Sequence, residues 1–112
     1  MQRLIILRGA PGSGKSTIAK SYRNFEKRIA WLKVDNFKDF FADDASAALE
    51  LVNGSAVSTL DYLLDQGFSV VMEGVFQDTK AIDNASKVAN KYNVQIKVFK
   101  LETSLSTLKK RD

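Results

Sequence analysis

Residues 4–17 read LIILRGAPGSGKST and carry the clearest structural signal in the chain. Four consecutive apolar residues at positions 4–7 lie close before a glycine, which is typical of a strand buried on both faces of a sheet. Residues 9–16 then match the pattern G-x-x-x-x-G-K-[ST] without a mismatch, and a helical pattern follows from residue 15 to about residue 25. The stretch therefore predicts a strand, an anion-binding loop and a helix in direct succession.

The loop pattern has a physical reason. Glycines let successive backbone N–H groups converge on an anion, and the N-terminus of the following helix adds partial positive charge. Lys15 is expected to reach the β- and γ-phosphate oxygens of a nucleotide, and Ser16 to provide a hydroxyl ligand for Mg²⁺. The predicted nucleotide-binding residues are Gly9, Ala10, Pro11, Gly12, Ser13, Gly14, Lys15, Ser16 and Thr17.

The alternative is that the glycines only build a tight turn between strand and helix. The four fixed positions match by chance at about 4 in 100,000 per starting position, if ordinary residue frequencies are assumed. Nucleotide triphosphate binding is therefore the favoured interpretation.

The rest of the chain alternates short β-rich runs with helical patterns. The further predicted strands cover residues 29–34, 68–72 and 94–101. Apolar residues recur at helical spacing at positions 49, 52, 56, 60, 63 and 64, and again at 82, 85, 89 and 92. Gly67 is expected to end the first of these helices, Asp78 to cap the second, and Thr103 or Ser104 to cap a last one. The order predicts an α/β fold: a P-loop NTPase-type parallel sheet of about four strands with helices on both faces, forming one domain over residues 1–112.

Composition limits the chemistry. The 112 residues include 17 Lys plus Arg, 13 Asp plus Glu, and neither His nor Cys, for a net charge of +4. Disulfides, zinc sites of the usual kind, Ser-His-Asp triads and thiol nucleophiles are therefore excluded. The longest apolar run near the start has four residues, far short of a signal sequence or a membrane span. We therefore expect a cytoplasmic protein with an anionic ligand and no membrane association.

Two carboxylates follow predicted strands. Ligands of open parallel sheets bind beyond the carboxyl ends of the strands, where Asp35 and Glu73 are expected to lie. Asp35 could accept the proton of an attacking hydroxyl, and Glu73 could hold Mg²⁺ and face the substrate. The structural alternatives are that Asp35 caps a helix starting at Asn36 and that Glu73 satisfies turn amides. Lys38 could hold a phosphate of the acceptor or lie exposed. Trp31 and Phe37 could stack on a base, but Trp31 lies within a predicted strand and is predicted to belong to the core.

Other nucleotide-binding classes fit less well. A GTPase would carry Asp-x-x-Gly after a later strand and Asn-Lys-x-Asp for guanine. Here the third predicted strand leads into Glu73-Gly74, and the nearest guanine-like string, at residues 90–93, lacks the Asp. Large ring ATPases need an additional helical domain, for which the chain is too short.

Four segments resemble the small P-loop kinases of the polynucleotide 5′-hydroxyl kinase and zeta-toxin type. They are LIILRGAPGSGKSTIAK at residues 4–20, WLKVDNF at 31–37, VVMEG at 70–74 and VFKLETSLSTLKKRD at 98–112. The resemblance implies that Lys15 and Ser16 bind ATP phosphates and Mg²⁺, that Asp35 is the general base and that Lys38 grips the acceptor. Glu73 with its following glycine looks more like the zeta-toxin and related small-molecule kinases.

In these families a basic lid with arginines follows the fourth strand, and then a fifth strand. Arg111 could be a first lid arginine or a frayed helix end. Because the rest of the lid does not follow it, we expect a shortened chain or a partner that completes the lid. The leading hypothesis is an ATP- and Mg²⁺-dependent phosphotransferase acting on a hydroxyl of a nucleic acid end, a nucleotide or a small metabolite. The alternatives are an ATP-binding module without catalysis, a zeta-toxin-like kinase of a sugar nucleotide, and a basic nucleic-acid-binding domain.

Overall fold

A computed structural model describes residues 1–10, 12–25, 27–42, 49–76 and 79–101 of the 112-residue chain. Strands and helices alternate along these residues, as the sequence predicts. The elements are β1 (Arg3–Gly9), α1 (Lys15–Phe25), β2 (Ile29–Lys33), the 3-10 helix η1 (Val34–Phe40), α2 (Leu49–Asp65), β3 (Ser69–Gly74), α3 (Lys80–Lys91) and β4 (Gln95–Leu101).

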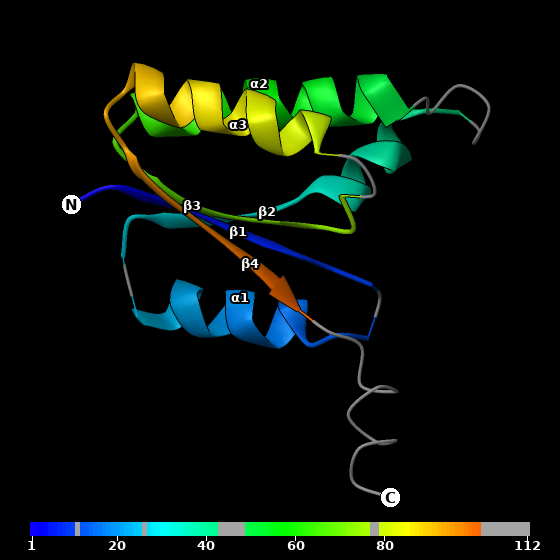
Figure 1. Cartoon of the computed structure of the whole chain (residues 1–112), viewed down its shortest axis with the longest axis horizontal. Coiled ribbons are helices and arrows are strands. Elements are labelled where there is room, and N and C mark those ends of the chain that lie inside the picture. Colours follow the sequence, from blue (N-terminus) through cyan, green and yellow to red (C-terminus); the bar gives the residue numbers. More distant parts are fainter. Residues whose placement is uncertain (11, 26, 43–48, 77–78, 102–112) are drawn as a thin grey trace, which may run out of the picture.

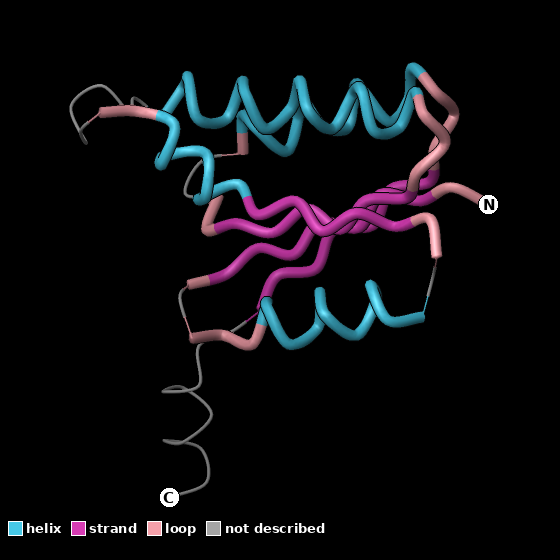
Figure 2. Tube along the Cα trace, turned by 180° about the vertical axis from the view of Figure 1, so that it is seen from behind, coloured by secondary structure: helices cyan, strands magenta, loops and turns pink. Residues whose placement is uncertain are grey.

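The four strands form one parallel sheet in the order β2-β3-β1-β4. Helices α2 and α3 lie side by side on one face, and α1 lies on the other (Figure 1). The view from behind shows the same three layers (Figure 2). The predicted α/β fold, with a parallel sheet covered on both faces, is thereby confirmed.

Strand β1 divides the core into two halves. Its residues alternate between the faces, so Leu4 and Ile6 join the core under α2 and α3, while Ile5 and Leu7 join the core under α1. All four are at most 2% exposed, as expected for a central parallel strand. Burial on both faces fixes the register of β1, and with it the position of the loop that follows.

The predicted ends of the elements hold in part. Gly67 ends α2 with φ of +87°, its N–H bonds to the carbonyl of Leu64, and the N–H of Phe68 bonds to that of Leu63. The residue at the N-cap of α3 is Thr79, so the position predicted for Asp78 was wrong by one residue. Asp78, Thr103, Ser104 and the predicted last helix lie outside the described residues.

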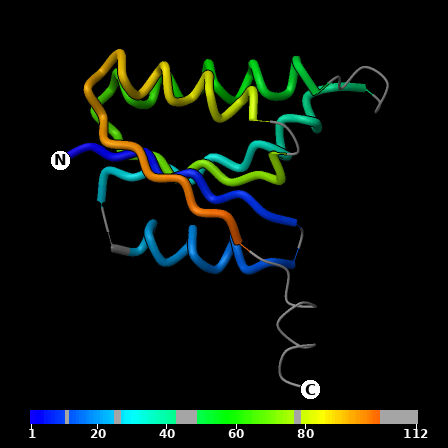
Figure 3. The backbone as a smooth tube through the Cα atoms, viewed as in Figure 1, coloured from blue at the N-terminus to red at the C-terminus, as the bar shows by residue number. Residues whose placement is uncertain are grey.

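All strands run in the same direction, which Figure 3 lets the reader follow along the chain. Their carboxyl ends therefore meet at one edge of the sheet, next to the start of α1. Strand β2 ends at Lys33, because Val34 already belongs to η1, and β3 continues to Gly74, two residues beyond its predicted end. No helix among the described residues is long and apolar enough to cross a membrane.

Candidate functional site: a phosphate-loop cavity at the strand ends

The loop after β1 has the backbone geometry that its glycines predict. Gly12 and Gly14 have φ of +83° and +95°, in the left-handed region that favours glycine. Helix α1 begins at Lys15, directly after the second of these glycines. The described part of the loop therefore leads into a helix N-terminus, where backbone N–H groups and the helix dipole favour an anion.

The ammonium group of Lys15 is folded back onto this loop. Its Nζ donates to the carbonyl oxygens of Gly9 at 2.7 Å and Ala10 at 3.0 Å. The residue is only 6% exposed, so these bonds compensate for the burial of its charge. Phosphate oxygens are stronger, charged acceptors and would compete for the same protons.

Ser16 and Glu73 meet across the site. The Ser16 Oγ lies 3.3 and 3.5 Å from the two carboxylate oxygens of Glu73. Glu73 lies in β3, where it pairs with Leu7 of β1 and Lys33 of β2, and this register holds its side chain beside the first turn of α1. A hydroxyl and a carboxylate are hard oxygen ligands of the kind that Mg²⁺ prefers.

Trp31 has a second role that the sequence does not reveal. It packs partly buried against the core under α1, so its predicted core placement holds only in part. Its indole Nε1 also donates to Glu73 Oε1 at 2.8 Å. The contact depends on β2 and β3 being neighbours in this register, which no local pattern shows.

One cavity of about 520 Å³ brings the predicted residues together. It is lined by Gly12, Gly14, Lys15, Ser16, Thr17, Asp35, Glu73 and Val75. Asp35 comes from the first turn of η1, and the residue before that helix, at its N-cap, is Lys33. The interpretation of Asp35 as a helix cap is therefore wrong. The described side-chain hydrogen bonds of Glu73 come from Ser16 and Trp31 rather than from turn amides.

A second, smaller cavity of about 130 Å³ adjoins the first. Its lining residues are Val34, Asp35, Lys38, Leu49, Val52, Asn53, Val75 and Phe76. Asp35 and Val75 line both cavities, whereas Lys38 lines only the smaller one. Asp35 thus lies at the boundary between the phosphate-loop cavity and a separate space.

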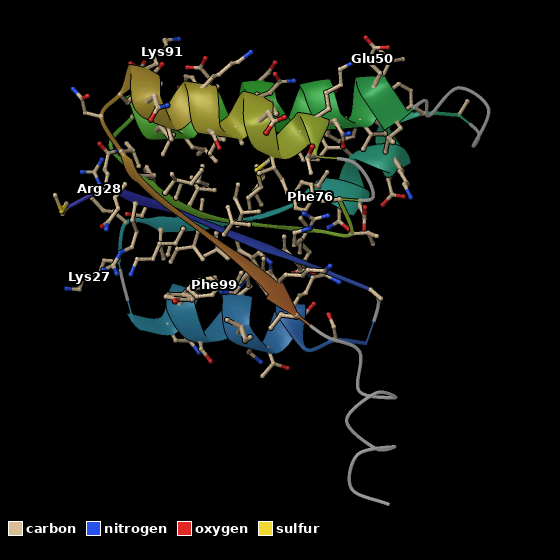
Figure 4. The ribbon with its side chains drawn as sticks, in the orientation of Figure 1. Lys27, Arg28, Glu50, Phe76, Lys91 and Phe99 are labelled. Carbon is tan, nitrogen blue, oxygen red and sulfur yellow. The ribbon has the colours of Figure 1, made fainter. Side chains whose placement is uncertain are left out.

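Arg8 and Phe76 support this smaller cavity, and sequence reasoning missed both. Phe76 has φ of +50°, an uncommon conformation for a bulky residue, and its carbonyl accepts a hydrogen bond from Arg8 Nη2 at 2.9 Å. Its ring packs so closely on Gly74 that an added Cβ there would lie 3.1 Å from it. Figure 4 shows Phe76 between the sheet and the α2–α3 layer.

The donor set fits Mg²⁺ held together with phosphates better than a metal held by protein ligands alone. Among the described residues, no group of three or more His, Cys, Asp or Glu side chains gathers. Mg²⁺ is commonly bound through one or two protein ligands plus substrate phosphates and water. Pro11 and Arg111, which belong to the predicted site, lie outside the described residues.

The fold and the glycine loop define a P-loop kinase-like α/β protein. The family described as AAA domain (AAA_33) matches residues 4–112, and the chain belongs to this family. No curated protein matches the chain in sequence.

Solved structures with the same fold are similar over most of the chain. A chain of the Pnkp1/Rnl/Hen1 complex has a TM-score of 0.76 at 23% identity, over 98% of this chain and 38% of its own length. Mycobacterium tuberculosis APS kinase CysC in complex with AMPPNP and APS has a TM-score of 0.68 at 21% identity, and the match covers 99% of this chain and 68% of the kinase chain. A chain of the PezAT chromosomal toxin–antitoxin system of Streptococcus pneumoniae has a TM-score of 0.68 at 18% identity, and the match covers 89% of this chain and 46% of the PezAT chain. The likeness to P-loop kinases is thereby confirmed for the fold, and the chain spans well under half of the Pnkp1/Rnl/Hen1 chain.

Proposed function

We propose that the chain is an ATP- and Mg²⁺-dependent phosphotransferase that moves the γ-phosphate of ATP to a hydroxyl acceptor. The observation that carries the proposal is the cavity that Lys15, Ser16, Glu73 and Asp35 line together. Phosphate-binding groups and a candidate base thus face the same space. The family match and the structural likeness to APS kinase support the same class of reaction. In this proposal residues 1–112 form one kinase-like domain.

Each group has a role in the proposed transfer. The loop N–H groups and the Lys15 ammonium bind the phosphates and offset negative charge on the transferring group. Ser16 and Glu73 would hold Mg²⁺, which neutralises phosphate charge when bound. Asp35 accepts the proton of the acceptor hydroxyl as its oxygen bonds to the γ-phosphorus and the bond from that phosphorus to ADP breaks.

The smaller cavity is the proposed place of the acceptor. Lys38 lies on its wall, where an ammonium group would attract a phosphate of a nucleotide or a nucleic acid end. Arg111, outside the described residues, is proposed to stabilise charge on the transferring group from a lid. The proposed acceptor is a hydroxyl of a nucleic acid end, a nucleotide or a small metabolite.

Replacing Lys15 tests the nucleotide site. Lys15→Ala is expected to weaken Mg²⁺-ATP binding at least about tenfold in calorimetric titration, because it removes a charged hydrogen-bond donor from the cavity. Lys20→Ala removes an exposed cation from the same helix and is the matched control. Circular dichroism checks that both variants are folded. If folded Lys15→Ala bound ATP as tightly as the wild type, the assignment of the loop as the nucleotide-binding site would be refuted.

Replacing Asp35 tests the chemistry. Asp35→Asn keeps the shape of an exposed side chain and removes the base, so transfer of labelled phosphate is expected to slow about 10²–10⁴-fold with ATP binding retained. Asp39→Asn, also exposed on η1, is the control and is expected to keep the wild-type rate. The acceptor panel comprises 5′-hydroxyl oligonucleotides, nucleosides and sugar nucleotides. ATP binding without transfer to any acceptor would favour a non-catalytic binding module.

A further inference from the structure

A hollow of about 390 Å³ lies beside the proposed site, at the outer edge of the sheet. Strand β2 is the edge strand here, and residues from β2, α1 and η1 line the hollow. We call the surface formed by Arg23, Trp31, Lys33, Asn36, Phe37 and Phe40 the β2-edge patch. It shares no lining residue with the phosphate-loop cavity, and the described side-chain hydrogen bond between the two runs from Trp31 to Glu73.

The patch presents aromatic rings to solvent. Phe40 is 73% exposed, and its ring meets Phe37 edge to face, with centroids 5.1 Å apart. Phe37 in turn packs against the core under α2 and α3. Phe40 is therefore an exposed ring supported by a side chain that packs on the core, and it is suited to stacking against a flat ligand.

Cations accompany these rings. The Lys33 ammonium lies 4.1 Å from the centroid of the Trp31 ring and the Arg23 guanidinium 5.1 Å from it. Among the described residues, none with an acidic side chain lines the hollow. The patch therefore combines aromatic faces with positive charge, and it complements an anionic ligand that carries rings.

The patch adjoins the proposed transfer site. Asn36 lines the hollow and directly follows Asp35 in the chain. Trp31 belongs to the patch and donates to Glu73, which lines the phosphate-loop cavity. A ligand that lies along Asn36 is thus next to Asp35, the proposed base.

We infer that the β2-edge patch binds single-stranded nucleic acid next to its reacting end. Bases stack on Phe40, and backbone phosphates lie against Arg23 and Lys33. An acidic peptide would use the cations but has no need of an exposed ring, so the combination favours a nucleic acid. The choice of a nucleic acid end as acceptor rests on the proposed function, whereas binding to the patch itself needs neither ATP nor Mg²⁺.

Binding of a labelled ten-nucleotide oligothymidine, followed by fluorescence anisotropy without ATP, tests the inference. Phe40→Ala is expected to weaken binding at least about fivefold, and Lys33→Ala to reduce the salt slope by about 0.7. The matched controls are Tyr62→Ala, which removes another exposed ring, and Lys87→Ala, which removes an exposed cation on α3. Both are expected to leave affinity unchanged. Trp31 is the only tryptophan, so oligonucleotide binding is also expected to change the intrinsic fluorescence.

Three outcomes would overturn the inference: no binding by a chain that binds ATP, equal losses in Phe40→Ala and Tyr62→Ala, or displacement of the oligonucleotide by an equimolar poly-glutamate peptide. The proposed function is separable from it. Lys15→Ala is expected to weaken ATP binding and to leave oligonucleotide binding unchanged. Phe40→Ala is expected to weaken oligonucleotide binding and to leave ATP binding unchanged. If the wild-type chain bound the oligonucleotide but not ATP, the proposed phosphotransferase function would be refuted and the inference about the β2-edge patch would not.

Discussion

Replacing Arg8 by Met removes the side-chain donor that bonds to Phe76 beside the smaller cavity. The Arg8 side chain reaches from β1 to the carbonyl of Phe76, 68 positions away, at 2.9 Å. Phe76 has φ of +50°, and such a conformation persists only where surrounding contacts enforce it. Met keeps an unbranched chain about as long as the aliphatic part of Arg and offers no donor, so the substitution removes the guanidinium group and this bond.

The size of the effect follows from the charge and exposure of the bond. A hydrogen bond with one charged partner contributes about 1.5–3 kcal/mol, and the half-buried position of Arg8 favours the lower end. A loss of about 1.5 kcal/mol lowers the Tm of a domain of this size by roughly 6 °C. Phe76 lines the smaller cavity and not the phosphate-loop cavity, so acceptor KM is expected to rise while ATP affinity stays constant.

Thermal unfolding followed by circular dichroism measures the first part, with Lys87→Met on α3 as the control for removing an exposed cation. Calorimetric titration with Mg²⁺-ATP and acceptor titrations in the transfer assay measure the second. A Tm within about 1 °C of wild type would show that the bond does not hold Phe76 in place. A rise in the ATP dissociation constant equal to that in acceptor KM would show that the two cavities are not separate in function.

Two further predictions concern the loop and the α2–α3 layer. Gly9→Ala would place a methyl carbon 2.8 Å from the Leu101 carbonyl oxygen, so ATP affinity in calorimetric titration is expected to fall more than about tenfold. Gly54→Ala is the control, because its added carbon meets nothing within 4 Å, and it is expected to leave ATP affinity unchanged. The Tyr92 hydroxyl holds the pKa of Asp61 below its ordinary value of 3.8, so the stability from this contact is present above that pH and lost as pH falls through the lowered value. The Tm difference between wild type and Tyr92→Phe is therefore expected to shrink below pH 3.8, and a constant difference down to about pH 2 would contradict this assignment.

Local patterns predicted most of the fold. The apolar run in β1 has two buried faces because each successive side chain points to the opposite side of the sheet, and an apolar residue at every position needs a core on both. The glycine spacing predicted the loop because only glycine adopts φ near +90° without strain. Gly67 ended α2 for the same reason.

The exact ends of elements were less predictable. Val34 and Asp35 look like the end of a strand and the cap of a helix, but the chain turns there into a 3-10 helix. The turn is set by contacts with α2 and β3, which local sequence does not contain. Predicted boundaries shifted by one or two residues at β2, β3, α3 and β4.

The sequence by itself determined the order of the glycine loop, the lysine and the hydroxyl, because these residues are neighbours along the chain. The tertiary structure decided what surrounds them: Asp35 at the boundary of two cavities, Trp31 bonded to Glu73, and Arg8 bonded to Phe76. The two hydrogen bonds join residues that lie 42 and 68 positions apart in the chain. They follow from the strand order β2-β3-β1-β4, in which β3 lies between two strands that precede it in the chain. Strand order depends on how whole helices cover the sheet, so no short segment of sequence encodes it.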